Sequence, residues 1–286
     1  MSKSYYRSIH VLFKASHIRE LAWHKDLAPL RNIMPGRSCN TPKEVFESVY
    51  EELLDDYMIE YVLKNELLKF LRKRNPGEFI GTEFHIGLGG SIGEPSKIDA
   101  VVIGDTGTAF EIKSRFDRTD RLESQINAYS KVFDKIVLVT EKFYSERFVK
   151  RIPSWVGHYE ISPIGVSVCR APKVYTKNLR ARDMLSSMYK PERIAFVKRV
   201  NAKAKYVPTY YRDLSRTLAM SMKPTEMNEH FCWHLKTRNK PIRCLQFLPE
   251  LPDCFTAALY DYWLLQRDIK SLIEVMDAPL YPNPNE

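Results

Sequence analysis

The sequence predicts an α/β fold built on a mixed β-sheet, and three observations lead to this prediction. Ile98–Ile103 and Thr108–Ile112 are β-branched or aromatic runs on either side of the turn signal Gly104-Asp105-Thr106-Gly107, which predicts an antiparallel hairpin. The continuous apolar run 135–140 is typical of a buried parallel strand. Segments with helical spacing of apolar residues lie before and after these strands, so sheet and helices alternate.

The predicted elements of the central region follow one another in a defined order. Apolar residues recur at helical spacing over 57–74, and Asn75-Pro76-Gly77 ends that helix. A strand over 78–86 comes next, followed by the hairpin. A second helix is expected over 119–133 and leads into the strand 135–140. The order is therefore αβββαβ, with further helices expected before and after it.

The hairpin brings three chemically active side chains together. Side chains alternate along a strand, so Glu111 and Lys113 share one face while their neighbours point into a core. Asp99 reaches the same face only if the loop has an odd number of residues. A three-residue loop over 105–107, with Gly107 at positive φ, satisfies this condition and sets Asp99 opposite Lys113.

Two carboxylates beside a lysine indicate metal-dependent phosphodiester chemistry. Neighbouring carboxylates repel each other, and a divalent cation with hard oxygen ligands relieves that repulsion. Such an ion activates water and neutralises charge in the transition state, and the lysine adds a fixed positive charge. The alternative interpretation is a salt bridge between strands without catalytic meaning, and the spacing by itself leaves both open.

Asp99, an eleven-residue gap and then Glu111-Ile112-Lys113 resemble the PD-(D/E)XK nuclease superfamily, which has the restriction-endonuclease-like fold. The proline of that motif is absent, since Lys97-Ile98 precedes Asp99. The order of elements over about 55–172 resembles the αβββαβ core of the superfamily, and 153–168 resemble an uncharacterised bacterial and phage branch of it.

The resemblance implies roles for individual residues. Asp99, Glu111 and the Ile112 carbonyl would hold Mg²⁺ or Mn²⁺, and Lys113 would act on the water or the leaving group. Gln125 matches an accessory glutamine of some branches. Glu60 is favoured as a further carboxylate at the metal, and Glu83 on the first strand competes with it for that role.

The charge distribution predicts a DNA-binding region after the nuclease-like core. Residues 171–243 contain 17 Lys and Arg against 5 Asp and Glu, a balance of +12, with interleaved tyrosines, and 244–286 carry −5. Cations with aromatics suit a phosphate backbone, so double-stranded DNA is the expected partner, although a solvated helical surface would have the same pattern. The cations expected to contact DNA are Lys97, Arg115, Arg118, Arg121, Lys198, Arg199, Lys203 and Lys205.

Length and composition predict the domain organisation and the cellular location. At 286 residues and 44% hydrophobic composition, the chain can bury a large core, and we expect an N-terminal helical segment over 1–54, the nuclease-like core over 55–172 and a basic helical domain over 173–286. No run of eighteen apolar residues or signal-peptide core is present, and five scattered cysteines form no disulfide pattern, so a cytoplasmic protein without membrane contact is expected. Cys232, His234, Cys244 and Cys254 lack a standard zinc spacing.

The sequence thus predicts a divalent-metal-dependent deoxyribonuclease. Two alternatives stay open: a nuclease-like protein that binds DNA without cutting it, and an interaction module of a defence system whose activity is gated by a partner. A second copy of the chain could also be a partner.

Overall fold

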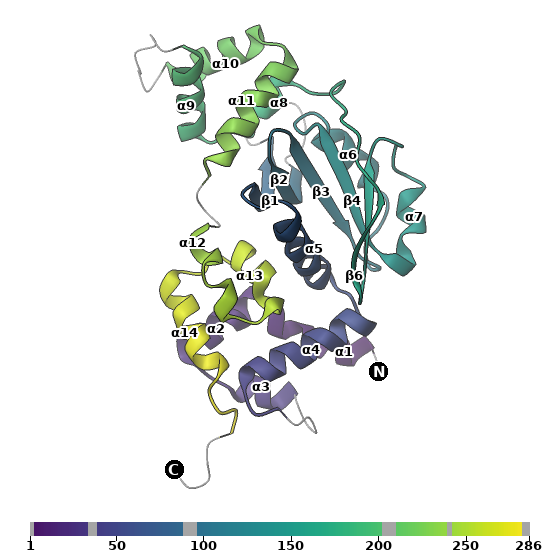
Figure 1. The fold of residues 1–286 in the computed structure, drawn as a ribbon, viewed down its shortest axis with the longest axis vertical. Coiled ribbons are helices and arrows are strands. Elements are labelled where there is room, and N and C mark those ends of the chain that lie inside the picture. The colour runs from purple at the N-terminus through teal and green to yellow at the C-terminus, as the bar shows by residue number, and fades with distance from the viewer. Residues whose placement is uncertain (1–2, 34–38, 88–95, 202–209, 239–241, 282–286) are drawn as a thin grey trace.

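The protein has a six-stranded mixed β-sheet with helices on both faces (Figure 1). The computed structural model describes residues 3–33, 39–87, 96–201, 210–238 and 242–281. The strands lie in the order β1-β2-β3-β4-β5-β6, so neighbours in sequence are neighbours in the sheet. Their bounds are β1 Phe79–Ile86, β2 Ser96–Ile103, β3 Gly107–Lys113, β4 Lys135–Glu141, β5 Gly157–Ser162 and β6 Gly165–Arg170.

The strand directions follow from the connections. The pairs β1–β2, β2–β3 and β5–β6 are antiparallel, whereas β3, β4 and β5 are parallel and need crossovers. The first crossover contains α6 (Leu122–Tyr129), and the second contains η2 (Lys142–Tyr144) and α7 (Glu146–Val149). The α/β class and the antiparallel hairpin with a following parallel strand are confirmed, and β5 and β6 extend the sheet.

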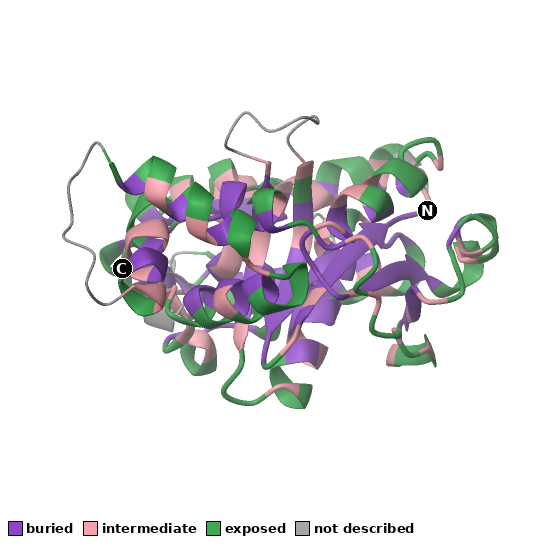
Figure 2. Cartoon of the chain, turned by 90° about the horizontal axis from the view of Figure 1, so that it is seen from above, coloured by how far each residue is buried: buried purple, intermediate pink, exposed green. Residues whose placement is uncertain are grey.

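Two hydrophobic cores cover the two faces of the sheet, and Figure 2 shows the strands buried between exposed helical surfaces. The α5-side core contains α5 (Glu60–Arg74) and strand residues such as Phe110 and Ile112. The α6-side core contains α6 and strand residues such as Ala109 and Leu138. Because side chains alternate along β3, Glu111 and Lys113 face the α6 side.

The helices outside the sheet divide between the same two cores. Around α5 lie α1 (Lys3–Ile9), η1 (His10–Phe13), α2 (Ala15–His24), α3 (Ala28–Ile33), α4 (Pro42–Asp56), α12 (Ile242–Leu245), η3 (Leu248–Glu250), η4 (Asp253–Phe255), α13 (Thr256–Asp261) and α14 (Gln266–Met276). Beside α6 lie α8 (Ala181–Ser186), α9 (Lys190–Val200), α10 (Tyr211–Ser221) and α11 (Pro224–Lys236).

The region expected as a single C-terminal domain over 173–286 is therefore split. Helices α8–α11 share the α6-side core, and the segment after them returns to the N-terminal helices, as the yellow and purple ribbons in Figure 1 show. The amide of Asn65 on α5 donates to the Asp253 carbonyl and accepts from the Ala257 N–H, and the Tyr262 hydroxyl donates to the Phe13 carbonyl. Contacts between the two ends of the chain cannot be deduced from local sequence patterns.

The register of the β2–β3 hairpin differs from the predicted one by two residues. Ile103 pairs with Gly107 and Ala100 with Phe110, so the loop is Gly104-Asp105-Thr106. Its odd length is confirmed, but Asp99 lies next to Glu111 in register, not opposite Lys113. Gly107 starts β3 because the Phe133 ring packs over it: an added Cβ would lie 2.7 Å from a ring carbon.

Within the described residues, every helix is too short or too polar to cross a lipid bilayer.

Candidate metal centre

The sheet is distorted where Asp99 on β2 faces Glu83 on β1. Glu83 has φ +50°, a left-handed conformation that is uncommon for a residue other than glycine. On β1, Ile80 packs in the α5-side core but Phe84 in the α6-side core, although both are even positions. The strand therefore changes face at Glu83, and backbone strain of this kind often accompanies a functional site.

The same change of face occurs on β2, where Ala100 packs in the α5-side core and Ile98 in the α6-side core. The ladder with β3 ends at Ala100 and Phe110. One residue further, the Asp99 carboxylate accepts the Ile112 N–H at 2.7 Å in place of a backbone carbonyl. The two strands diverge there, and Asp99 lies at the opening between them.

The environment of Asp99 disfavours its charged form. Burial, followed by the nearby negative charge of Glu111, raises the pKa of Asp99 well above its ordinary value, and the hydrogen bond from Ile112 and the charge of Lys64 only partly oppose this. Asp99 has no ion pair within 4 Å among the described residues, so nothing in that part of the chain neutralises it directly. Two mutually repelling carboxylates of this kind call for a cation.

Glu111 is buried, with 2% of its surface exposed, and both of its oxygens have partners. Lys113 Nζ lies 2.5 Å from Oε1, so the predicted convergence of these two side chains on one face is confirmed. The Tyr129 hydroxyl lies 2.6 Å from Oε2, and Gln125 Nε2 donates to that hydroxyl at 3.4 Å. Tyr129 is not among the predicted site residues; its position one helical turn after Gln125 was the available signal for a polar role.

Glu60 and Glu83, the two candidates for a further carboxylate, have different surroundings. Glu83 forms ion pairs with both Lys64 and Lys97, which lower its pKa although burial opposes this. Glu60 is exposed in the first turn of α5, and its charge contributes to the raised pKa of Asp99. The geometry thus leaves Glu60 available beside Asp99 and keeps Glu83 bound.

Lys64 is a site residue that sequence analysis did not find. It is 4% exposed, and its Nζ contacts both Glu83 and Asp261, the latter at 3.0 Å. Burial by itself would lower the pKa of Lys64, but the two carboxylates outweigh burial and raise it. Asp261 comes from α13, so the distant C-terminal segment contributes to this cluster.

The residues at the opening of the hairpin fit a divalent cation with oxygen ligands. Asp99 and Glu111 supply two carboxylates from adjacent strands. Gln125 Oε1 is buried without a hydrogen-bond partner in the described part of the chain, although buried polar atoms normally have one. An unpartnered acceptor on the side chain that contacts Tyr129, the partner of Glu111, suits a cation or its bound water.

The cations expected to contact DNA lie in several environments. Arg118 and Arg121 are exposed at the start of α6, near the C-terminal end of β3. Arg115 forms an ion pair with Glu141 and contacts the Tyr57 and Tyr144 rings, so it has a structural role. Lys97 is half-exposed and pairs with Glu83.

On α9, Lys198 is exposed and the Arg199 guanidinium lies over the Trp233 ring at 4.1 Å. Lys203 and Lys205 lie outside the described residues. Helix α11 contacts the turn of the hairpin, since Lys236 lies 3.3 Å from Asp105 and Cys232 packs beside Gly107. From Gly107 to Lys113 the strand spans about 20 Å, so the Lys236–Asp105 contact and the Glu111–Lys113 pair lie toward opposite ends of β3.

Comparison with known proteins places the chain in a family. Residues 54–248 match the family described as Bacteriophage P4 protein cII. The chain belongs to this family. The matched region of this family member runs from the end of α4 to η3, so it includes both the candidate metal centre and α8–α11.

Comparisons with curated proteins and with solved structures do not identify a function. A search of curated proteins finds no match. A solved structure of a protein of unknown function from Silicibacter pomeroyi is similar at 15% sequence identity and a TM-score of 0.33, covering 51% of this chain and 94% of that one.

Proposed function

We propose that the protein is a divalent-metal-dependent deoxyribonuclease with a PD-(D/E)XK-like core. The observation that carries the proposal is the opening between β2 and β3, where the ladder ends and Asp99, Glu111 and Lys113 meet. The order α5-β1-β2-β3-α6-β4 is the element order on which the resemblance to this superfamily rests.

A simple salt bridge explains only part of this arrangement. The Glu111–Lys113 pair neutralises two of the three groups. It leaves Asp99 partly buried, repelled by Glu111 and held by one backbone N–H. Because an uncompensated buried carboxylate is costly, its presence here favours a cation-binding role.

In the proposed site, Asp99, Glu111 and the Ile112 carbonyl would hold Mg²⁺ or Mn²⁺, with Glu60 at its outer side. A bound ion of this kind activates water and neutralises charge that develops on a phosphate. The Ile112 N–H and the Tyr129 hydroxyl keep the two carboxylates oriented. Lys113 would present its ammonium to the attacking water or to the leaving oxygen.

DNA is the proposed substrate, with Arg118 and Arg121 beside the reactive end and the exposed cations of α8–α11 at the other end of the hairpin. Phosphate contacts of this kind position DNA without reading its sequence.

One assay tests the function. The purified full chain is incubated with supercoiled and linear double-stranded DNA in Mg²⁺, in Mn²⁺ and in EDTA. We expect cleavage in either metal and none in EDTA. DNA binding without cleavage under all conditions would contradict nuclease activity and favour the alternative of a DNA-binding protein that does not cut. In that protein the Glu111–Lys113 ion pair would have only a structural role.

A further inference from the structure

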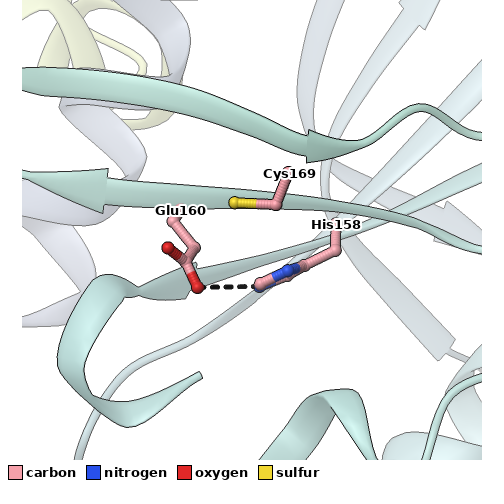
Figure 3. Close-up of side chains that lie close together, drawn as sticks. All are labelled: His158, Glu160 and Cys169. Atoms are coloured by element: carbon pink, nitrogen blue, oxygen red, sulfur yellow. Dashed lines mark ion pairs between the residues drawn. The ribbon is translucent and has the colours of Figure 1, made fainter. Parts of the chain in front are cut away.

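A second group of metal-ligating side chains lies on the β5–β6 hairpin (Figure 3). His158 and Glu160 come from β5, and Cys169 comes from β6. One donor atom from each of them lies within 4.8 Å of the others, and His158 Nε2 is 4.0 Å from Glu160 Oε1. An imidazole, a carboxylate and a thiol are thus gathered at one point.

The strand register explains why these three side chains share a face. His158 and Glu160 are two residues apart on β5, so they point to the same side. Val168 pairs with Tyr159, which packs in the α5-side core, and the next residue, Cys169, therefore faces the opposite side. A β-bulge follows, because the partner of His158 is Arg170, and Cys169 is the extra residue.

The donor set differs in chemistry from the candidate metal centre. Asp99 and Glu111 offer hard oxygen atoms, which suit Mg²⁺ and Mn²⁺. Thiolate, imidazole and carboxylate together suit Zn²⁺, which takes these ligands at about 2.0–2.3 Å in a tetrahedron and often keeps a fourth position open. A thiolate and a carboxylate would also balance the double charge of the ion.

We propose that His158, Glu160 and Cys169 form a binding site for Zn²⁺ or a similar borderline-soft divalent cation, independent of the proposed nuclease centre. Tetrahedral bonds of about 2.0–2.3 Å place donor atoms roughly 3.3–3.8 Å apart, so donor atoms that now lie within 4.8 Å of one another need to close by about 1.5 Å at most. Cys169 is exposed and Glu160 is partly exposed, so both can move, and an ion can enter from solvent.

The surroundings favour the ligand form of His158 but not that of Cys169, because burial and the negative charge of Glu160 raise the pKa of the Cys169 thiol, so the ion must displace this proton. Burial lowers the pKa of His158, so its imidazole is neutral at neutral pH. His158 Nε2 lies 2.9 Å from the Thr140 hydroxyl, which occupies this nitrogen in the metal-free protein and would release it to the ion. The cations Arg170 and Lys142 act on His158 and Cys169 respectively and oppose a metal, so the affinity depends on all three ligands.

The location indicates a structural clamp. Strand β6 is an edge strand of the sheet, and a metal bound between β5 and β6 would hold this edge in place. Lys113, Thr140 and Glu160 are in register across β3, β4 and β5, so the clamp lies two strands, or roughly 10 Å, from the Lys113 strand on the same face.

The test is a Co²⁺ titration of the metal-free full chain, with Zn²⁺ as competitor. We expect a near-ultraviolet thiolate-to-cobalt absorption band that saturates at one Co²⁺ per chain when Mg²⁺ is present in excess, and that is displaced by Zn²⁺. Cys169→Ser should abolish the band, and Glu160→Gln should weaken Zn²⁺ binding by about 100-fold or more, since even loss of a ligand's supporting group costs 10–100-fold. Cys39→Ser, which changes a partly buried cysteine outside the β5–β6 hairpin, should keep the band.

Two results would overturn the proposal: a parent protein without a thiolate-to-cobalt band, or a Cys169→Ser variant that retains it. The outcome is independent of nuclease activity, because Glu111→Gln should leave the band and the Zn²⁺ affinity unchanged. Cys169 is exposed, so its substitution by serine leaves the core intact and a lost band reports ligation.

Discussion

The two ends of β3 carry opposite kinds of charge. At the C-terminal end, Glu111 meets Asp99 in a closely packed opening with a single lysine beside them. At the N-terminal end, the hairpin turn contacts α11, and the basic helices α8–α11 present exposed cations. Buried carboxylates bind a cation, whereas exposed cations bind a polyanion, so one strand separates the proposed chemistry from the proposed DNA attachment.

Substitutions at the two ends of β3 should therefore have different consequences. A change at the carboxylate end should affect catalysis with little effect on DNA affinity. A change at the basic end should affect affinity and its salt dependence and leave the metal requirement unchanged.

Asp99→Asn should produce the largest effect. Asparagine keeps an oxygen that can accept the Ile112 N–H but removes a metal ligand, so we expect cleavage to fall on the order of 100-fold or more. Because the environment of Asp99 already disfavours its charged form, a neutral side chain of the same shape should leave the metal-free variant at least as stable as the parent in thermal unfolding. A variant that cuts DNA at nearly the parental rate would show that Asp99 is not a metal ligand.

Tyr129→Phe should produce an intermediate effect at the same end. It removes the hydroxyl that contacts Glu111 Oε2, and loss of such an orienting group typically weakens metal binding 10–100-fold. The Mg²⁺ concentration that gives half-maximal cleavage should rise accordingly. Tyr210→Phe, an exposed tyrosine beside α10, is the matched control and should leave it unchanged. An unchanged Mg²⁺ requirement in Tyr129→Phe would exclude this role of the hydroxyl.

Reversing two exposed cations of the basic helices, Lys198→Glu with Arg216→Glu, should weaken DNA binding. Each lost phosphate contact reduces the slope of log affinity against log salt by about 0.9 for duplex DNA. Lys43→Glu with Lys270→Glu makes the same charge change on α4 and α14 and should have little effect on this slope. Equal effects of the two pairs would mean that overall charge, not α8–α11, controls binding.

His234 on α11 should make stability depend on pH. Burial, with the charge of Arg199, lowers the pKa of His234 to about 4, below the ordinary value of 6.5. Between pH 6.5 and 4 His234 is therefore protonated in the unfolded chain but neutral in the folded chain. Its contribution to the free energy of unfolding is full above pH 6.5 and is lost as the pH falls toward 4. We expect a loss of about 1–3 kcal/mol from this group, measured by urea unfolding at several pH values.

The matched comparison for this prediction uses two histidine variants. His234→Gln should flatten the fall in unfolding free energy between pH 6.5 and 4, and His24→Gln, which changes an exposed histidine, should leave it as in the parent. A parental slope in His234→Gln would show that other groups, such as His230, cause the acid sensitivity.

Local patterns predicted much of the central fold. The apolar runs of β2, β3 and β4 and the helical stripe of α5 are strong signals because each element buries one face or both. The hairpin register was wrong because a glycine can be required for packing as well as for a positive φ, and Gly107 is required for its contact with Phe133.

Other features of the site had no local signal. The left-handed Glu83 and the opening at Asp99 depend on how three strands pair. Asp261 reaches Lys64 only because the C-terminal helices pack against the N-terminal ones, more than 190 residues away in sequence. The thiol of Cys169 joins His158 through a bulge, which no spacing rule reveals.

The most direct test of the central claim is the rate of supercoiled DNA cleavage in Mg²⁺ by the parent, Glu111→Gln and Asp105→Asn, prepared in parallel. Glu111 and Asp105 are acidic residues of the same hairpin, one at each end, and only Glu111 belongs to the proposed metal centre. We predict cleavage by the parent and Asp105→Asn at similar rates and a loss of at least about 100-fold in Glu111→Gln. Equal rates in all three proteins would contradict the account.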